Sequence, residues 1–301
     1  MTASAGYRSV TVSDHETGTS FRTAVFYPSL ASELPEVLGP FTESIAREGE
    51  IAPGSQTLVV ISHGTGSMPM LHRGLAIHLA RHGFVVALPE HPGNSRTDDS
   101  LAGTKANLLN RPRHLSAVAD WAYQSELFHS ILMPASLGVI GRSLGGYTAL
   151  AIAGGRPTAF PWETEGKQAE PIDVTPDARV KALVLLAPAA AWFLEDGALD
   201  GVSIPIPMLT GEKDDLEIPG HKTLANGSVV HMPAGHSAII KSGVRNQELV
   251  EHRVIPNAGH YSFKSPYPVG MRTPAVPPSQ DPAGFDRVAF YDQMCTDVLG
   301  F

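Results

Sequence analysis

Cysteine is nearly absent from this chain of 301 residues, in which Cys295 is the only one. A single cysteine excludes a disulfide within the chain, and we expect Cys295 to be buried as a small apolar side chain near a C-terminal helix. Long apolar runs are also missing. No stretch approaches about 18 consecutive apolar residues, and the first residues contain no apolar core of a signal peptide. We therefore expect no membrane span and a cytoplasmic location.

Clusters of basic residues are missing as well. Lys and Arg number 22 against 30 Asp and Glu, and the resulting net charge of −8 argues against nucleic acid as a partner. Hydrophobic residues make up 43% of the chain and charged residues 17%, which is typical of a globular protein with a substantial core. The length allows one large α/β domain or at most two small ones. No internal repeat is visible, and we expect a single domain over residues 1–301.

Short apolar runs alternate with helical patterns along the chain. β-branched and aromatic runs at 8–12 and 21–27 flank a polar turn and predict an N-terminal antiparallel hairpin, followed by a surface excursion over 29–56. Strands alternating with helices imply an α/β fold with a mostly parallel central sheet and helices on both faces. The remaining predicted strands lie at 57–62, 84–88, 137–140, 180–187, 206–210 and 251–255, and the predicted helices at 70–82, at 115–123 and directly after residue 143.

Two irregular stretches interrupt this alternation. They lie around residues 154–178 and 216–246, and both are rich in Gly, Pro and polar residues. Both are too long for ordinary connections between elements of a compact domain. We therefore expect these two stretches to be lid-like insertions or substrate loops.

A serine stands at a turn between an apolar run and an Ala-rich helical segment. The turn has the sequence Gly141-Arg142-Ser143-Leu144-Gly145, directly after the apolar residues 137–140. Strand, sharp turn and helix in this order are typical of a nucleophile elbow, where a serine hydroxyl is exposed on a strained turn. The two glycines have a steric reason, because a β-carbon on either would collide with the neighbouring strand or helix. Ser143 is therefore the predicted nucleophile.

A serine hydroxyl needs a base to remove its proton and an acid to orient that base. In this fold the acid follows the serine along the chain and the histidine follows the acid, each after a strand. The acid is therefore expected after the strand at 206–210. Asp214 is favoured there, because a tight turn after Gly211 would return it to the carboxyl edge of the sheet. Asp215 and, less favoured, Glu212 remain alternatives.

The histidine is expected after the last strand. His260 follows the strand at 251–255 on a loop of small residues, which would let its ring reach inward. His236 has a similar local sequence, Ala-Gly-His, but no clear strand precedes it. Position in the alternation therefore favours His260 as the base.

The oxyanion formed during acyl transfer needs two backbone N–H donors. One is expected from Leu144, the residue after the nucleophile, at the positive end of the following helix. The other is expected from the glycine-rich loop after the strand at 57–62, with Thr65 as the donor. His63, in the same loop, is expected to brace the loop by hydrogen bonding rather than to carry a proton.

The motifs described above, together with several further segments, resemble those of a known group. The chain resembles α/β-hydrolases of the dienelactone hydrolase superfamily, nearest to the predicted dienelactone hydrolases related to platelet-activating-factor acetylhydrolase. The resemblance implies a triad of Ser143, Asp214 and His260, with the amides of Thr65 and Leu144 as the oxyanion hole. The matching segments, in family order, are Phe26-Tyr27-Pro28, Ser62 to Gly66, Glu90 to Asn94, Arg111-Pro112, Gly141 to Gly146, Arg179 to Ala182, Gly211 to Asp214 and Ala258 to Phe263.

The chain departs from this group in two respects. Typical dienelactone hydrolases use a cysteine nucleophile where this chain has Ser143, and the segments 221–246 and 273–282 match no pattern of the family. We therefore expect a serine esterase that needs no metal or organic cofactor. Small and apolar neighbours, among them Met68 and Trp192, favour a short-chain ester or lactone as the small-molecule substrate. An amidase, a thioesterase or an acyltransferase would use the same triad, and a catalytically silent binding module is the alternative of a different class.

Overall fold

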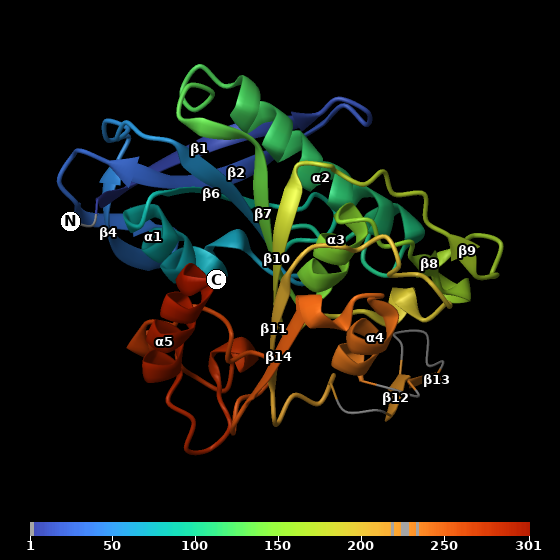
Figure 1. The fold of residues 1–301 in the computed structure, drawn as a ribbon. Helices are drawn as coiled ribbons and strands as arrows, with labels where there is room; N and C mark the ends of the chain where they lie inside the picture. Colours follow the sequence, from blue (N-terminus) through green and yellow to red (C-terminus); the bar gives the residue numbers. More distant parts are fainter. Residues whose placement is uncertain (1–2, 218–219, 224–228, 233–234) are drawn as a thin grey trace.

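The chain, described by a computed structural model at residues 3–217, 220–223, 229–232 and 235–301, is built around one large sheet. The strands of this sheet are β1 (Ser4–Asp14), β2 (Thr19–Ser29), β3 (Leu34–Leu38), β4 (Phe41–Arg47), β5 (Gln56–Ser62), β6 (Phe84–Pro89), β7 (Leu132–Arg142), β10 (Val180–Leu186), β11 (Ile206–Gly211) and β14 (Val250–Ile255). They lie in the order β14-β11-β10-β7-β5-β6-β2-β1-β4-β3 (Figure 1). The strands from β14 to β6 are parallel, whereas β2 runs antiparallel to β6 and to β1.

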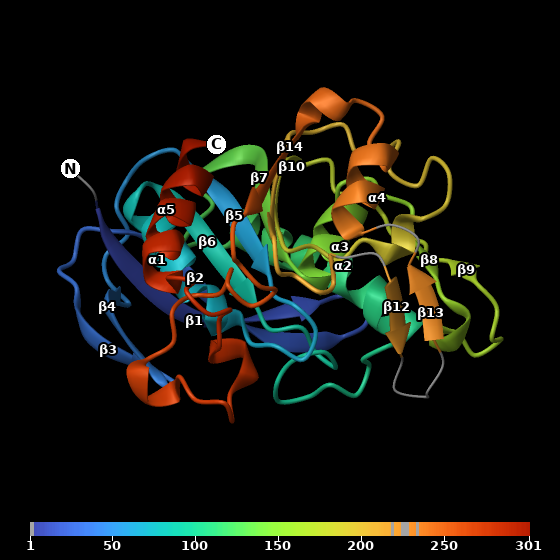
Figure 2. The same ribbon diagram turned by 90° about the horizontal axis from the view of Figure 1, so that it is seen from below.

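Helices cover both faces of the sheet, as Figures 1 and 2 show. The helices are α1 (Arg73–Arg81), α2 (Lys105–Gln124), α3 (Leu144–Ile152), α4 (His236–Gly243) and α5 (Arg287–Gly300). One core contains the apolar side chains of α2 and α3, and the other contains those of α1 and α5. The central strands contain continuous apolar runs where both of their faces are buried; residues 58–61 of β5 are one example. The predicted mostly parallel sheet with an N-terminal antiparallel hairpin and helices on both faces is confirmed.

The segment at 29–56 is not the surface excursion that its sequence predicts. It forms the hairpin β3–β4, in which β4 also pairs in parallel with β1 through Gly6 and Ala46. Two apolar side chains of β3 are largely exposed, since Leu34 is 63% and Val37 68% accessible, whereas Leu38 at its end is buried. A strand at the edge of a sheet tolerates proline and charged residues and shows no continuous apolar run, so its pattern does not indicate a buried strand.

Helix α2 begins ten residues earlier than its sequence predicts. The side chain of Thr104 caps it by accepting a hydrogen bond from the backbone N–H of Asn107. Pro112 lies inside the helix and obscures the pattern, because proline normally ends or kinks a helix. Proline cannot donate to the carbonyl of Leu108 four residues before it, and that carbonyl instead accepts a hydrogen bond from the Tyr147 hydroxyl of α3. The interruption in α2 is thus used to join two helices.

Both irregular insertions contain regular structure where they are described. Within 154–178, β8 (Thr158–Ala159) and β9 (Glu170–Pro171) form a short antiparallel pair. Within 216–246, β12 (Gly220–Thr223) pairs with β13 (Val229–Met232), and helix α4 follows. Parts of the second insertion lie outside the described residues. The role of both insertions as lids stays a prediction.

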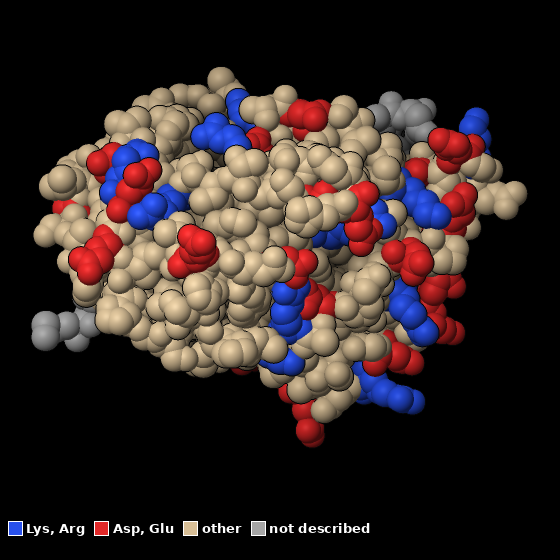
Figure 3. Space-filling view, turned by 90° about the horizontal axis from the view of Figure 1, so that it is seen from above, with Lys and Arg blue, Asp and Glu red and all other residues tan. Residues whose placement is uncertain are grey.

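The surface mixes charges of both signs. On the face seen in Figure 3, acidic and basic side chains are interspersed between broad areas that carry neither. Cys295 is buried on α5, as its isolation in the sequence predicts. Where the structure is described, no helix is both long and apolar enough to cross a membrane.

Candidate active site

Ser143 occupies a strained turn between β7 and α3. Its backbone angles, φ 55° and ψ −121°, lie where residues other than glycine are rarely found. The turn is held by its own backbone, because Ser143 N–H donates to the carbonyls of Leu186 and Ala187 after β10. A β-carbon on Gly141 would lie closer than 3.0 Å to the backbone of α3, and one on Gly145 equally close to the end of β5. Both glycines are therefore sterically required.

The structure brings together the three side chains predicted from the order of the strands. Nε2 of His260 lies 3.0 Å from Oγ of Ser143, and Nδ1 of the same ring lies 2.9 Å from Oδ2 of Asp214. The three residues follow β7, β11 and β14, whose carboxyl ends meet at one edge of the sheet. Asp214 is only 2% exposed, and its Oδ1 accepts a hydrogen bond from the N–H of Leu216.

The alternative candidates for the acid and the base lie outside this hydrogen-bonded series. Asp215 is exposed, and Glu212 accepts a hydrogen bond from the backbone N–H of Asn257. His236 begins helix α4 and accepts a hydrogen bond from the N–H of Ala190. The direction in which each side chain leaves its turn therefore distinguishes Asp214 from its neighbours.

The surroundings of His260 favour its neutral form. Burial lowers the pKa of the ring below its usual value, the positive charge of Arg142 lowers it further, and the Asp214 carboxylate opposes both effects. Because the carboxylate can only accept a hydrogen bond, Nδ1 carries the proton and Nε2 presents a lone pair to Ser143. A neutral histidine in this tautomer is able to act as a general base at neutral pH.

The loop after β5 lies against the nucleophile. A β-carbon on Gly64 would come 3.0 Å from Cβ of Ser143, a tight contact, so glycine favours this close approach of the backbone. Thr65 follows, and its hydroxyl accepts a hydrogen bond of 2.8 Å from the Asn94 side chain. On the other side, Leu144 is the first residue of α3, where backbone N–H groups have no partner within the helix. The two predicted oxyanion donors thus belong to segments on either side of Ser143.

A buried arginine supports this loop and was not singled out from the sequence by its chemistry. Arg111 of α2 has no exposed surface and donates to Oδ1 of Asn94 at 2.7 Å, to Oγ of Ser62 at 3.2 Å and to the carbonyl of His63. Asn94 in turn donates to Thr65. Arg111 and Asn94 lie in segments that carry the family resemblance, which is the only sequence signal that marks them.

His63 braces the same loop. Its Nε2 accepts a hydrogen bond from the N–H of His91, so Nδ1 carries the proton and donates to the carbonyl of Gly64 at 2.8 Å. Complete burial lowers its pKa to about 3. His63 therefore stays neutral near pH 7 and has the bracing geometry expected from the sequence.

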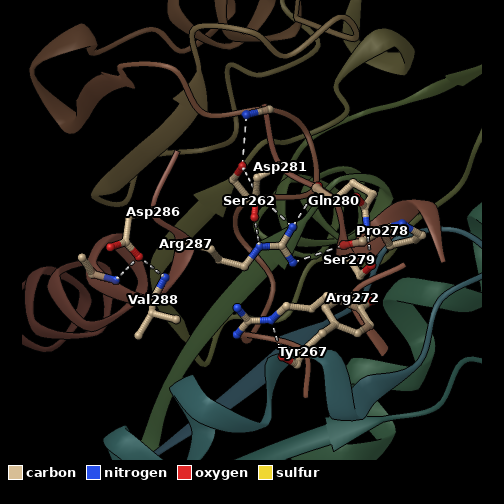
Figure 4. Close-up of polar contacts among 12 residues, drawn as sticks. Ser262, Tyr267, Arg272, Pro278, Ser279, Gln280, Asp281, Asp286, Arg287 and Val288 are labelled. Carbon is tan, nitrogen blue, oxygen red and sulfur yellow. Dashed lines mark hydrogen bonds and ion pairs between the residues drawn. The ribbon is translucent and has the colours of Figure 1, made fainter. Parts of the chain in front are cut away.

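The proline-rich C-terminal segment holds the loop that carries His260. Oγ of Ser262 accepts a hydrogen bond from the N–H of Gly259 and donates to Oδ1 of Asp281 at 2.7 Å (Figure 4). Arg287 of α5 donates to both carboxylate oxygens of Asp281. The segment at 273–282 is uninformative as sequence, yet its Asp281 holds the loop that carries His260 through Ser262.

The two residues predicted to contact substrate are placed by aromatic and apolar packing. Trp192 is half-buried, packs edge-on against Tyr147 with ring centroids 5.0 Å apart, and donates to Glu163 at 2.9 Å. Met68 packs against a small cluster that includes Phe41 and Tyr267. Their contact with substrate stays a prediction.

Two cavities lie apart from Ser143. One, of about 330 Å³, separates the β1–β2 turn from α2 and the loop at 173–178. The other, of about 290 Å³, lies between Tyr267 and the start of α5. In the part of the chain that the structure describes, no three His, Cys, Asp or Glu side chains are grouped as metal ligands.

The order of the sheet, the helices on both faces and the serine turn after β7 define the α/β-hydrolase fold. A ferulic acid esterase from Streptomyces cinnamoneus matches this structure with a TM-score of 0.64, covering 98% of this chain and 87% of that chain. Because the two sequences are only 18% identical, this likeness establishes the shared fold alone.

The sequence is also similar to a known family over part of its length. The model of the family described as platelet-activating factor acetylhydrolase, isoform II, matches residues 23–106. This segment runs from β2 to the first turn of α2; it includes Thr65 and Asn94 and ends before Ser143. Among curated protein sequences, none matches the chain significantly.

Proposed function

We propose that this chain is a serine hydrolase that cleaves a carboxylic ester through an acyl-enzyme on Ser143. The observation that carries the proposal is the continuous hydrogen-bonded series from Ser143 through His260 to the buried Asp214. The names of the two similar groups, an acetylhydrolase family and an esterase, agree with ester hydrolysis.

The geometry supports a two-stage reaction. Oγ of Ser143 attacks the acyl carbon while Nε2 of His260 takes the hydroxyl proton, and the ionised Asp214 stabilises the resulting imidazolium. The tetrahedral oxyanion faces the N–H groups of Leu144 and Thr65. His260 then gives its proton to the leaving alcohol, and the ester bond breaks. Water, deprotonated by His260, attacks the acyl-enzyme, and the acid is released as Ser143 recovers its proton.

We further propose that the acyl group is short, as in a short-chain ester or a lactone. The residues around the nucleophile, Leu144 and the Pro188-Ala189 pair, are small or apolar, and a β-carbon on Gly146 would come closer than 3.0 Å to Pro188. These small or apolar neighbours of Ser143 support a short acyl group. Met68 and Trp192 are the proposed substrate contacts farther from the serine.

Active-site labelling with a fluorophosphonate, followed by an ester panel graded by acyl length and including lactones, tests the proposal. We expect the label on Ser143, and we expect S143A to lower kcat/KM by about 10³-fold or more while the protein remains folded. The exposed Ser242 of α4 provides a matched control, and S242A should label and hydrolyse like the wild type. A label on another residue, or hydrolysis that survives S143A, would contradict the proposal.

A further inference from the structure

Arg142 connects three of the segments that form the candidate site. It precedes Ser143 in the elbow, and its Nη2 donates a hydrogen bond of 2.5 Å to the carbonyl oxygen of His260. Its guanidinium carbon lies 5.3 Å from the centre of the Tyr261 ring. On the opposite side, a β-carbon on Gly64 would stand 3.1 Å from its Nη1. One side chain thus spans the nucleophile turn, the histidine loop and the oxyanion loop.

The burial of this cation is not explained by pairing. Arg142 is 3% exposed, and its Nε has no hydrogen-bond partner. Among the described residues it forms no ion pair within 4 Å, and the Asp214 carboxylate attracts it only at longer range. A buried charge without a carboxylate partner and a buried N–H without an acceptor both cost free energy. An apolar side chain would fill the same space without these costs, so stability alone does not account for an arginine here.

The charged and titratable groups that face His260 come from three segments. Asp214 approaches from the loop after β11, Arg142 from the elbow, and Tyr261 and Lys264 from the histidine loop itself. Lys264 is also buried, with its ammonium 4.8 Å from the centre of the Tyr261 ring. Burial and then the charge of Arg142 lower the pKa of Lys264 to about 6. Lys264 is therefore mostly neutral at pH 7, and Arg142 is the cation that persists.

We propose that Arg142 is a positioning residue that ties the turn carrying Ser143 to the loop carrying His260 and holds its guanidinium charge beside this histidine. The hydrogen bond to the His260 carbonyl fixes the backbone from which the imidazole extends, while Asp214 orients the ring. The guanidinium charge disfavours a proton on the free ring, so the base is available at lower pH. The effect on reaction rate rests on the proposed function, whereas the effect on His260 does not.

The test is an NMR titration of the His260 imidazole in the wild type and in R142M, R142K and K264M, with H260Q to assign the signal. Because titration needs no substrate, it reports on Arg142 even if Ser143 forms no acyl-enzyme. We expect His260 in the wild type to titrate below the usual histidine pKa of about 6.5. R142M should raise this pKa by about one unit, and R142K by less than half as much because it keeps the charge.

Kinetics on the best ester then separate positioning from charge. We expect R142M and R142K to lower kcat about 10-fold or more with little change in KM, since neither side chain has the planar guanidinium that reaches the His260 carbonyl. K264M should leave kcat close to that of the wild type at pH 8, where Lys264 is already neutral. If circular dichroism shows that R142M is unfolded, R142Q repeats the comparison with a neutral donor. Equal titration shifts in R142K and R142M, or no change in either titration or kcat, would overturn the proposal.

Discussion

At the scale of single residues, Asp214 and Asp215 show how burial separates two identical side chains. Asp214 is 2% exposed and holds Nδ1 of His260, whereas Asp215, one position later, is exposed to solvent. The acid of a triad must be held by the protein, because its task is to fix the tautomer and orientation of the histidine. Adjacent carboxylates in one acidic turn are therefore not interchangeable.

A pair of amide substitutions tests this difference. D214N places an N–H₂ group or an amide oxygen where the carboxylate accepts the His260 proton, so the ring loses its stabilised tautomer. We expect kcat to fall by about 10³- to 10⁴-fold. D215N changes the net charge equally and should stay within about twofold of the wild type. Steady-state kinetics at pH 8 distinguish the two; comparable losses in both variants would show that Asp214 is not the triad acid.

At the scale of elements, the elbow depends on how closely α3 starts behind β7 and β5. The first turn of α3 follows Ser143 at once, so Gly145 lies against the carbonyl end of β5 with no room for a side chain. The strained backbone of Ser143 is thereby enforced by two packed elements rather than by local preference.

Two alanine substitutions in this region should differ strongly in their effect on stability. In G145A the new β-carbon would come closer than 3.0 Å to the backbone of Ser62, so we expect a loss of about 3 kcal/mol or more, with loss of activity. In G138A, within β7, the β-carbon would meet a methyl group of Val59 at 3.4 Å, and we expect a change of less than about 1 kcal/mol. Urea unfolding measures both. A G145A protein as stable as G138A would contradict the steric account.

The predictability of the elements depends on their place in the sheet. The strands β5, β6, β10 and β11 each contain a continuous apolar run because neighbours bury both faces, and such a run marks a buried strand. The β3–β4 hairpin has no such continuous apolar run, because only one of its faces packs against the core. The first half of helix α2 could not be predicted, because Pro112 normally indicates the end of a helix. The hydrogen bond from Tyr147 to the Leu108 carbonyl, which compensates for the proline, forms only in the folded protein.

At the scale of the whole molecule, the site is backed by several buried histidines. His63, His72 and His91 have no exposed surface, and His114 is 2% exposed. Burial lowers the pKa of His63 to about 3 and that of His114 to about 4, and the nearby Arg111 charge acts in the same direction. All of them are therefore neutral in the folded protein near pH 7.

This arrangement predicts sensitivity to acid. Between pH 6.5 and about 4 the unfolded chain binds protons on these histidines while the folded chain does not, so the free energy of unfolding decreases as the pH falls. Each such histidine contributes on the order of 1 kcal/mol per pH unit over this range. Urea unfolding at pH 7, 6 and 5 should show the decline, and H114Q should reduce its slope, with the exposed His129 in H129Q as control. Equal free energies of unfolding at pH 7 and pH 5 would refute this expectation.

Neighbouring residues along the chain encode the alternation of apolar strands and helices, the serine turn with its two glycines, and the order of serine, acid and histidine. Each depends on periodicity or on close spacing, which a linear pattern preserves. Where parallel strands end at a common edge, the segments that follow them must meet, and for this reason Ser143 and His260 could be paired in advance.

The side chains that support these residues are set by contacts between distant segments of the folded chain. Arg111 reaches Asn94 across 17 positions, and Arg142 reaches the carbonyl of His260 across 118. Asp281 holds the histidine loop from a proline-rich segment that has no distinctive pattern of its own. Such contacts join segments that no periodicity relates. They exist because folding buries polar groups, and each buried polar group then has to find a partner wherever the packed chain provides one.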